Sequence, residues 1–138
     1  MTKPTRPKHA GLRHVALNVH DIAKVEYFYV DLMGMQVEWR PDEDNVYLCS
    51  GNDNLALHKA DMFYKPETGA DKAQSLDHIG FIVDDMDEVD RWFEFLTAHD
   101  VKFAKPPKTH RDGARSFYCF DPEQNVVQII YHPPISKN

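Results

Sequence analysis

The stretch LRHVAL (residues 12–17) returns as LDHIGF (residues 76–81), sixty-four residues further along the chain. The same offset continues beyond each stretch and pairs Val19 with Val83, Asp21 with Asp85, Val25 with Val89, Phe28 with Trp92, and Leu32 with Leu96. A second offset of seventy residues pairs Tyr47 with Phe117, Cys49 with Cys119, and His58 with Gln128. An internal repeat of this length indicates two copies of one supersecondary unit.

The first copy has the pattern of one strand, one helix and three further strands. Residues 11–19 alternate between apolar and polar side chains, which is typical of a strand with one buried face. Asp21 is suited to cap a helix that begins at the next residue, and Gly34 is suited to end it. The remaining strands are predicted at residues 35–40, 44–50 and 53–59.

The second copy repeats this order, with a helix after Asp85 and a polar loop at residues 105–113 that contains Pro106 and Pro107. Its strands are predicted at residues 76–83, 101–104, 115–120 and 125–132. The sequence therefore predicts an α+β fold in which two βαβββ modules form a cup-like mixed sheet around a pseudo-twofold axis. The expected parts of this single domain are a flexible tail (1–9), a first module (10–60), a linker (61–75) and a second module (76–134).

Composition excludes several classes of protein. The 138 residues carry a formal net charge of −6 without a long basic run, which argues against binding to nucleic acid. No segment approaches the ~20 apolar residues that a membrane-spanning helix needs, and residues 1–8 have no apolar signal-peptide core. Two cysteines in such a chain are more typical of free thiols than of a disulfide, so we expect a cytoplasmic protein.

The two-residue period of a strand indicates which way the histidines point. In the first strand, Val15, Leu17 and Val19 should pack under the helix, so His14 should face away from it. The equivalent strand places His78 in the same way. We expect the repeat to bring a set of four side chains to one centre on the helix-free side: His14, His58, His78 and Gln128.

With these positions in place, the chain resembles the vicinal oxygen chelate superfamily. That group includes glyoxalase I, extradiol dioxygenases, fosfomycin-resistance thiol transferases, methylmalonyl-CoA epimerase and the bleomycin-resistance proteins. The resemblance covers about residues 10–132 and rests on the two repeated stretches and on RSFYCFDPEQN (residues 115–125). The last of these is similar to the family's DPxGN-type turn, with Gln124 in place of the usual glycine. The resemblance implies paired βαβββ units around a divalent metal that chelates two adjacent substrate oxygens.

Transferred residue by residue, the resemblance implies metal ligands at His14, His58, His78 and Gln128. Gln128 stands where metal-dependent members usually have glutamate, and His58 falls where glyoxalase-type members have glutamate or glutamine. A neutral amide oxygen can bind a divalent ion, but it lacks the charge of a carboxylate and cannot act as a general base. The histidines favour Fe, Ni, Zn or Mn as the metal.

Two functions remain open at this point. The first is a metal-dependent lyase, isomerase or oxygenase that acts on a small oxygenated metabolite, and the three histidines favour it. The second is a non-catalytic binding or resistance protein of the bleomycin-resistance type, and Gln128 favours that one. The resemblance also implies a homodimer, because many members of the family dimerise.

Other polar residues have two interpretations each. His132 is a candidate for proton transfer or a residue at the rim of the cup. Arg111 and Arg115 lie near the end of the predicted loop, where each could bind an anionic substrate or remain a solvated charge. Tyr118 could line the cup or belong to the core.

Overall fold

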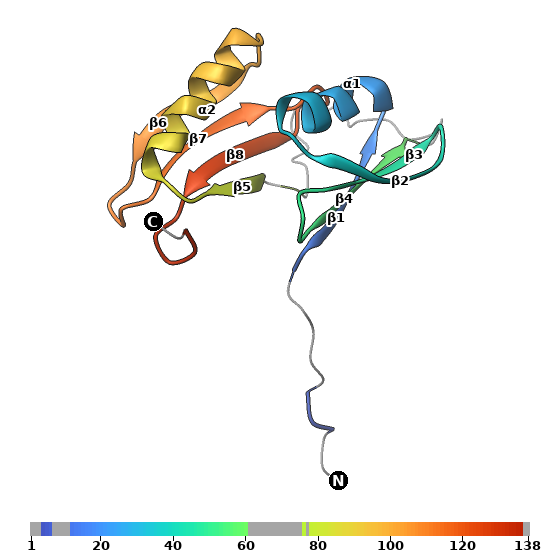
Figure 1. The fold of residues 1–138 in the computed structure, drawn as a ribbon, viewed down its shortest axis with the longest axis horizontal. Helices are drawn as coiled ribbons and strands as arrows, with labels where there is room; N and C mark the ends of the chain where they lie inside the picture. The colour runs from blue at the N-terminus through green and yellow to red at the C-terminus, as the bar shows by residue number, and fades with distance from the viewer. Residues whose placement is uncertain (1–3, 7–11, 61–75, 77, 137–138) are drawn as a thin grey trace, which may run out of the picture.

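The computed structural model of the protein describes residues 4–6, 12–60, 76 and 78–136. The predicted linker at residues 61–75 and most of the predicted tail at residues 1–9 lie outside these ranges. The described part has the predicted α+β fold of two βαβββ modules, each with a four-stranded mixed sheet. Figure 1 shows the two sheets with their helices on the same side.

Module 1 contains one sheet and one helical segment. Its strands are β1 (His14–Val19), β2 (Gln36–Asp42), β3 (Asn45–Cys49) and β4 (Asn54–Lys59). The sheet order is β1-β4-β3-β2, in which β1 and β4 are parallel and the other pairs are antiparallel. The helical segment begins as α1 (Ile22–Glu26), capped by the Asp21 side chain, and continues as the wider π-helix η1 (Tyr27–Leu32).

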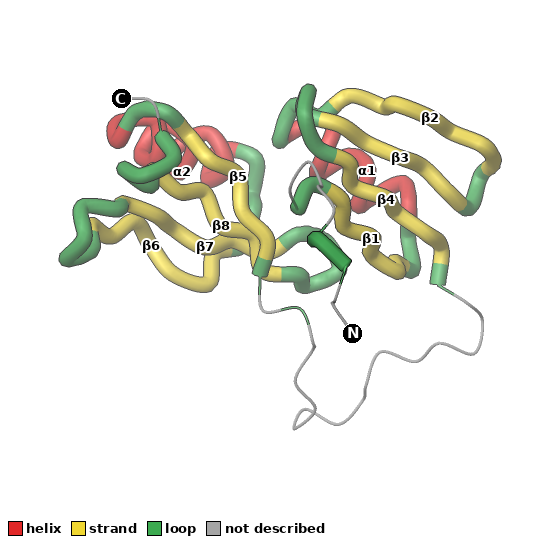
Figure 2. Tube along the Cα trace, turned by 90° about the horizontal axis from the view of Figure 1, so that it is seen from below, coloured by secondary structure: helices red, strands yellow, loops and turns green. Residues whose placement is uncertain are grey.

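Module 2 repeats this topology. Its strands are β5 (Ile79–Val83), β6 (Phe103–Thr109), β7 (Arg115–Phe120) and β8 (Val126–Tyr131), in the order β5-β8-β7-β6. Its helix α2 (Met86–Ala98) is capped by Asp85, as predicted. Seen from below, both sheets lie in front of their helices (Figure 2), so each sheet has one helix-covered face and one face that we call the open face.

The predicted polar loop at residues 105–113 is wrong in its first half, because β6 continues to Thr109. β6 is the edge strand of its sheet, and its register against β7 shifts between Lys105 and Lys108. Proline is tolerated at such edge and bulge positions, since its missing N–H does not remove a required ladder bond. Pro106 and Pro107 therefore mark an irregular edge strand and not the start of a loop.

The hydrophobic core lies between the sheets and the helical segments and spans both modules. In β1, Leu17 and Val19 are buried while His14, Ala16 and Asn18 are exposed, so the strand has the predicted orientation. Cys49 and Cys119 are free thiols. Burial, together with the nearby Asp121 carboxylate, raises the pKa of Cys119 to about 12.

Two polar contacts join the modules, and both are made by residues of the turn between β7 and β8. The hydroxyl of Tyr29, fully buried in η1, donates a hydrogen bond of 2.7 Å to Oδ2 of Asp121. Asp121 begins the turn between β7 and β8 and also accepts bonds from Glu123 N, Asn125 N and Asn125 Nδ2. Nearby, the His20 imidazole lies 2.8 Å from the Glu123 carboxylate.

No helix in the described residues is long and apolar enough to cross a membrane.

Candidate functional site

The open face of module 1 is arranged in rows, because residues paired across neighbouring strands point to the same side. One row contains His14 opposite Asn54, and another contains Asn18, His58 and Asn45. Between them lies a row of Ala16, Ala56 and Tyr47. The polar side chains that the sequence singles out therefore occupy the two outer rows.

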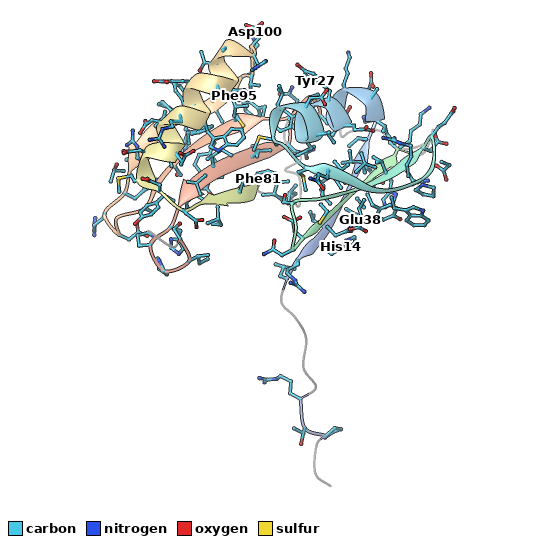
Figure 3. All side chains as sticks on the ribbon, in the orientation of Figure 1. His14, Tyr27, Glu38, Phe81, Phe95 and Asp100 are labelled. Carbon is cyan, nitrogen blue, oxygen red and sulfur yellow. The ribbon has the colours of Figure 1, made fainter. Side chains whose placement is uncertain are left out.

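His14 is held by an amide that a carboxylate orients. Its Nδ1 lies 2.7 Å from Oδ1 of Asn54, while Nδ2 of Asn54 donates to both carboxylate oxygens of Glu38 at 3.2–3.3 Å. A carboxylate only accepts, so it directs the amide nitrogen toward itself and the amide oxygen toward the imidazole. His14 must then carry its proton on Nδ1, which leaves the lone pair of Nε2 for a ligand or a metal. Figure 3 shows Glu38 and His14 in this part of module 1.

His58 is held in the same manner in the other outer row. Its Nδ1 lies 2.6 Å from Oδ1 of Asn45, and Nδ2 of Asn45 donates to Oδ1 of Asp42 at 2.9 Å. The Asp42 carboxylate is fixed in turn by the backbone N–H of Asp44 at 2.8 Å. The ring of Tyr47 contacts the imidazole edge-on, with centroids 5.8 Å apart.

The register shows that His58 and Gln128 are not equivalent. Ala16 pairs with Ala56 in module 1, and Gly80, its counterpart, pairs with Gln128 in module 2. The residue equivalent to Gln128 is therefore Ala56, so the offset is seventy-two residues in the last strand and, from Tyr47 and Tyr118, seventy-one in the strand before it. The step from seventy-one to seventy-two comes from turn length, since residues 50–53 join β3 to β4 whereas residues 121–125 join β7 to β8.

His58 is also separated from His14. It pairs with Asn18, four positions along β1, which corresponds to about 13 Å at the ~3.3 Å rise of a parallel strand. Each imidazole is also bonded to an asparagine in its own row. The metal set proposed below therefore contains His14 and does not contain His58.

In module 2, three of the predicted residues come together on the open face. Tyr118 pairs with Gln128, and its hydroxyl accepts a 3.0 Å bond from Nε2 of Gln128. The imidazole of His78 meets the Tyr118 ring edge-on at 5.3 Å, and the ammonium of Lys105 lies 5.9 Å from the same ring. Tyr118 thus links the predicted ligands His78 and Gln128.

The amide of Gln128 is oriented by this contact. Because its nitrogen faces Tyr118, its oxygen Oε1 faces β5, where Gly80 lies opposite. A Cβ at position 80 would lie 3.6 Å from Oε1, so glycine keeps the space beside this oxygen free of a side chain. Gln128 is 9% exposed, and it presents a hard oxygen donor toward the strand that His78 precedes.

The remaining predicted residues are placed elsewhere. Arg115 lies on the helix-covered face, where Nε and Nη2 donate to the Asp90 carboxylate of α2 at 3.0 and 2.7 Å. This fork lowers the pKa of Asp90 and ties α2 to β7, so Arg115 is not placed to meet a ligand on the open face. Arg111 is exposed in the turn between β6 and β7, and His132 follows the end of β8 in a half-buried position.

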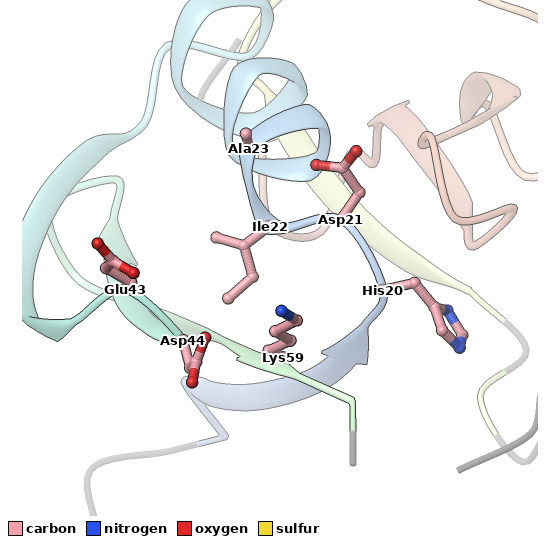
Figure 4. Close-up of a pocket in the computed structure, with 7 residues that line it drawn as sticks. All are labelled: His20, Asp21, Ile22, Ala23, Glu43, Asp44 and Lys59. Atoms are coloured by element: carbon pink, nitrogen blue, oxygen red, sulfur yellow. The ribbon is translucent and has the colours of Figure 1, made fainter. Parts of the chain in front are cut away.

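Two surface pockets lie away from these residues. Figure 4 shows the one where the turns after β1 and β2 meet Lys59, lined by His20, Asp21, Ile22, Ala23, Glu43, Asp44 and Lys59. The other lies on the outer side of α2, around Trp92 and Phe95. Neither is lined by a predicted metal ligand.

Sequence reasoning missed the residues that orient the two imidazoles: Glu38, Asp42, Asn45 and Asn54. A signal was present, because asparagine is depleted in strands and yet begins both β3 and β4. Only the pairing of the strands shows that each asparagine faces a histidine.

The donors of the open face suit a borderline divalent metal. His14 offers Nε2, Gln128 offers Oε1, and Gly80 leaves room beside that oxygen. Ligating histidines characteristically bond through their other ring nitrogen to an oxygen, as His14 does. Across the described residues, no group of three or more His, Cys, Asp and Glu side chains is close enough to hold a metal. The set His14, His78 and Gln128 contains only two side chains of those types.

Two βαβββ modules, with His14 at the start of β1 and His78 directly before β5, define the class of protein to which this fold belongs. The chain belongs to the Glyoxalase/Bleomycin resistance protein/Dioxygenase superfamily, whose profile matches residues 11–129.

Solved structures show the same fold at low sequence identity. A lactoylglutathione lyase from Agrobacterium tumefaciens is 23% identical with a TM-score of 0.74, over 94% of this chain and 98% of that one. A genomically encoded fosfomycin resistance protein from Listeria monocytogenes is 19% identical with a TM-score of 0.71, over 91% and 95%. A superfamily member from Sphaerobacter thermophilus is 25% identical with a TM-score of 0.66, over 90% and 98%.

Proposed function

We propose that the protein is a metal-dependent enzyme of the glyoxalase or dioxygenase type, acting on a small oxygenated metabolite. In this proposal His14, His78 and Gln128 hold a divalent ion, which is Fe, Ni, Zn or Mn. The observation that carries it is the bond from His14 through Asn54 to Glu38, which leaves Nε2 as a metal-binding lone pair.

The bound metal would supply a Lewis acid that polarises two adjacent substrate oxygens. The protein's own residues orient the metal ligands and keep other side chains out of the site. Asn54 and Glu38 orient His14, while Tyr118 orients Gln128 so that its oxygen faces β5. Gly80 keeps a side chain out of the space next to that oxygen.

One observation favours a non-catalytic binding protein as the second candidate. The row that contains Gln128 has no carboxylate in either module, because Ala56 takes the equivalent position in module 1. A proton transfer next to a carbonyl needs a base, and an amide cannot serve as one. In this second reading the open face would retain a small molecule without converting it.

Elemental analysis of protein purified without chelator tests the proposal. We expect about one equivalent of Fe, Ni, Zn or Mn per chain, and the identity of the metal would narrow the chemistry. His78→Ala should lose most of this metal, whereas His99→Ala, at the end of α2, should retain it. A wild-type protein that is free of metal and takes up none on reconstitution would favour the binding protein instead.

A further inference from the structure

His58 is held as firmly as His14, although it lies outside the proposed metal set. The chain of contacts runs from Asp42 through Asn45 to Nδ1 of His58, with distances of 2.9 and 2.6 Å. The Asp44 N–H holds the carboxylate, and the Tyr47 ring contacts the imidazole edge-on. Four separate groups therefore determine where this imidazole lies and how it is turned.

The same contacts determine which ring nitrogen carries the proton. Because the Asp42 carboxylate only accepts, it takes the amide N–H of Asn45 and leaves the amide oxygen for His58. The proton of neutral His58 is then on Nδ1, and Nε2 has a lone pair. A proton can be added to Nε2 without any change in the bond to Asn45, so the imidazole is already arranged as an acceptor.

The fold itself does not require this arrangement. In module 2, the counterparts of His58 and Asn45 are Ile130 and Ser116, which pair across β7 and β8 in the same way. The sheet of module 2 therefore forms with an aliphatic side chain at this position. A histidine with a determined tautomer in module 1 points to contact with a ligand.

We propose that His58 accepts a proton at Nε2 from an acidic hydroxyl of the substrate, and that Asn45 and Asp42 are positioning residues. The O–H bond breaks with its electron pair left on oxygen, and an N–H bond forms at Nε2. A phenolic or enolic hydroxyl fits this role, because a phenol has an ordinary pKa of about 10 and a protein environment can shift a pKa by several units. The inference rests on the proposed function in treating the open face as the substrate side.

Charge and distance narrow the substrate further. Asp42, Glu43 and Asp44 lie at the turn that ends in the row of His58, and these three carboxylates outnumber the nearby cation Lys59. The net negative charge disfavours a substrate with an anionic group next to the hydroxyl. His58 lies about 13 Å along the strand from His14 at ~3.3 Å per residue. The hydroxyl therefore belongs to a part of the substrate remote from the oxygens that a metal near His14 would chelate.

Nitrogen NMR of protein labelled at histidine tests the arrangement without any ligand. We expect neutral His58, assigned from its loss in His58→Ile, to carry its proton on Nδ1 and none on Nε2. Asn45→Ser, which copies the module 2 residue, should give a mixture of tautomers while the other histidine signals stay in place. A mixture in the wild type would overturn the inference, as would a His58 tautomer that Asn45→Ser leaves unchanged.

The second test uses 4-nitrophenol with protein stripped of metal, because this probe has an acidic hydroxyl whose absorbance reports its ionisation. We expect the bound probe to be ionised to a greater extent than free probe at the same pH. His58→Ile should abolish the difference and weaken apparent binding about tenfold, while the control His99→Ile should change neither. Equal absorbance for wild type and His58→Ile would overturn the proposal, whether or not the probe binds.

The result of the 4-nitrophenol test can be distinguished from the result of the metal analysis that tests the proposed function. The probe carries one hydroxyl and is used without metal, so metal content does not enter the readout. A metal-binding protein with no effect of His58→Ile would retain the proposed function and refute the proton acceptor. A metal-free protein in which His58→Ile has the expected effect would refute the proposed metal-dependent function and retain the proton acceptor.

Discussion

At the scale of single residues, the open face of module 1 contains two asparagine amides, each bonded to a carboxylate and to a histidine. The carboxylate orients the amide, and the amide oxygen then determines the imidazole tautomer. Asn54 and Asn45 both accept from Nδ1 of a histidine and donate to an acidic residue. Outer contacts of this kind raise the precision with which a histidine can meet a metal or a substrate. Their replacement should therefore alter binding before it alters folding.

Gln128→Glu should tighten binding of a divalent metal. The carboxylate restores a negative charge, and the Tyr118 hydroxyl, which now accepts from the amide, can donate to it instead. We expect the dissociation constant for Zn²⁺, measured by competition with a chromophoric chelator, to fall by about tenfold or more. Gln36→Glu, on exposed strand β2, provides a charge-matched control that should have no such effect. Weaker metal binding by Gln128→Glu would show that residue 128 does not face the metal.

Tyr29→Phe should destabilise the protein. Burial and the Asp121 carboxylate raise the pKa of Tyr29 well above its ordinary value, so the phenol stays protonated and donates to Asp121. Removing this donor leaves a buried carboxylate short of one partner, which costs about 1–3 kcal/mol. Urea denaturation near neutral pH should show the loss, and Tyr27→Phe, at a half-exposed position, should stay within about 0.5 kcal/mol of the wild type. Equal midpoints for Tyr29→Phe and the wild type would contradict the role of this bond.

At the scale of elements, turns decide which residues of the two modules correspond. The turn from β7 to β8 is one residue longer than the turn from β3 to β4, and a one-residue change moves a side chain to the other face. A one-residue difference also arises before β7, because Tyr47 corresponds to Tyr118 at an offset of seventy-one residues, so Cys119 corresponds to Leu48 and not to Cys49. Cys119 is fully buried in the core, whereas Cys49 shares the alternation of Asn45 and Tyr47 on the open face.

The longer turn contains a strained position. Gln124 has a φ of 69°, in the left-handed region where a Cβ is unfavourable, and it stands where the similar turns of the family have glycine. Gln124→Gly should therefore raise the free energy of unfolding by about 0.5–1 kcal/mol, after the entropy cost of glycine is subtracted. Thermal or urea unfolding would measure it. Gln36→Gly, within β2, should have the opposite sign, and destabilisation by both changes would show that the turn is not strained.

At the scale of the whole molecule, the modules are held together through the Asp121 turn, while the edge strands β1 and β5 expose their open faces. Ala16 and Asn18 are exposed on β1, and Ile82 on β5 is 45% exposed. Exposure of this kind on strands that form sheet edges among the described residues suits contact with a second copy of the chain. We therefore expect the two half-sites to meet across a homodimer.

Mixing two variants tests this expectation. His14→Ala damages module 1 and Gln128→Ala damages module 2, so each pure variant should lose metal. If a site joins module 1 of one copy to module 2 of the other, a mixed dimer contains one intact site. Refolding an equal mixture should then restore metal binding, read by elemental analysis after gel filtration. A mixture that binds no more metal than the separate variants would place the whole site within one chain.

The sequence by itself determined the repeat, the topology of each module and the orientation of its first strand. These follow from local periodicity, since alternating side chains and helix caps are properties of short segments. His14 faces the side that the pattern predicts. The tertiary structure alone decided which residues oppose one another across strands, because register depends on turn lengths that similarity does not reveal. It placed Ala56, and not His58, at the position equivalent to Gln128, turned Arg115 toward Asp90, and brought Asn45 and Asn54 to the two imidazoles.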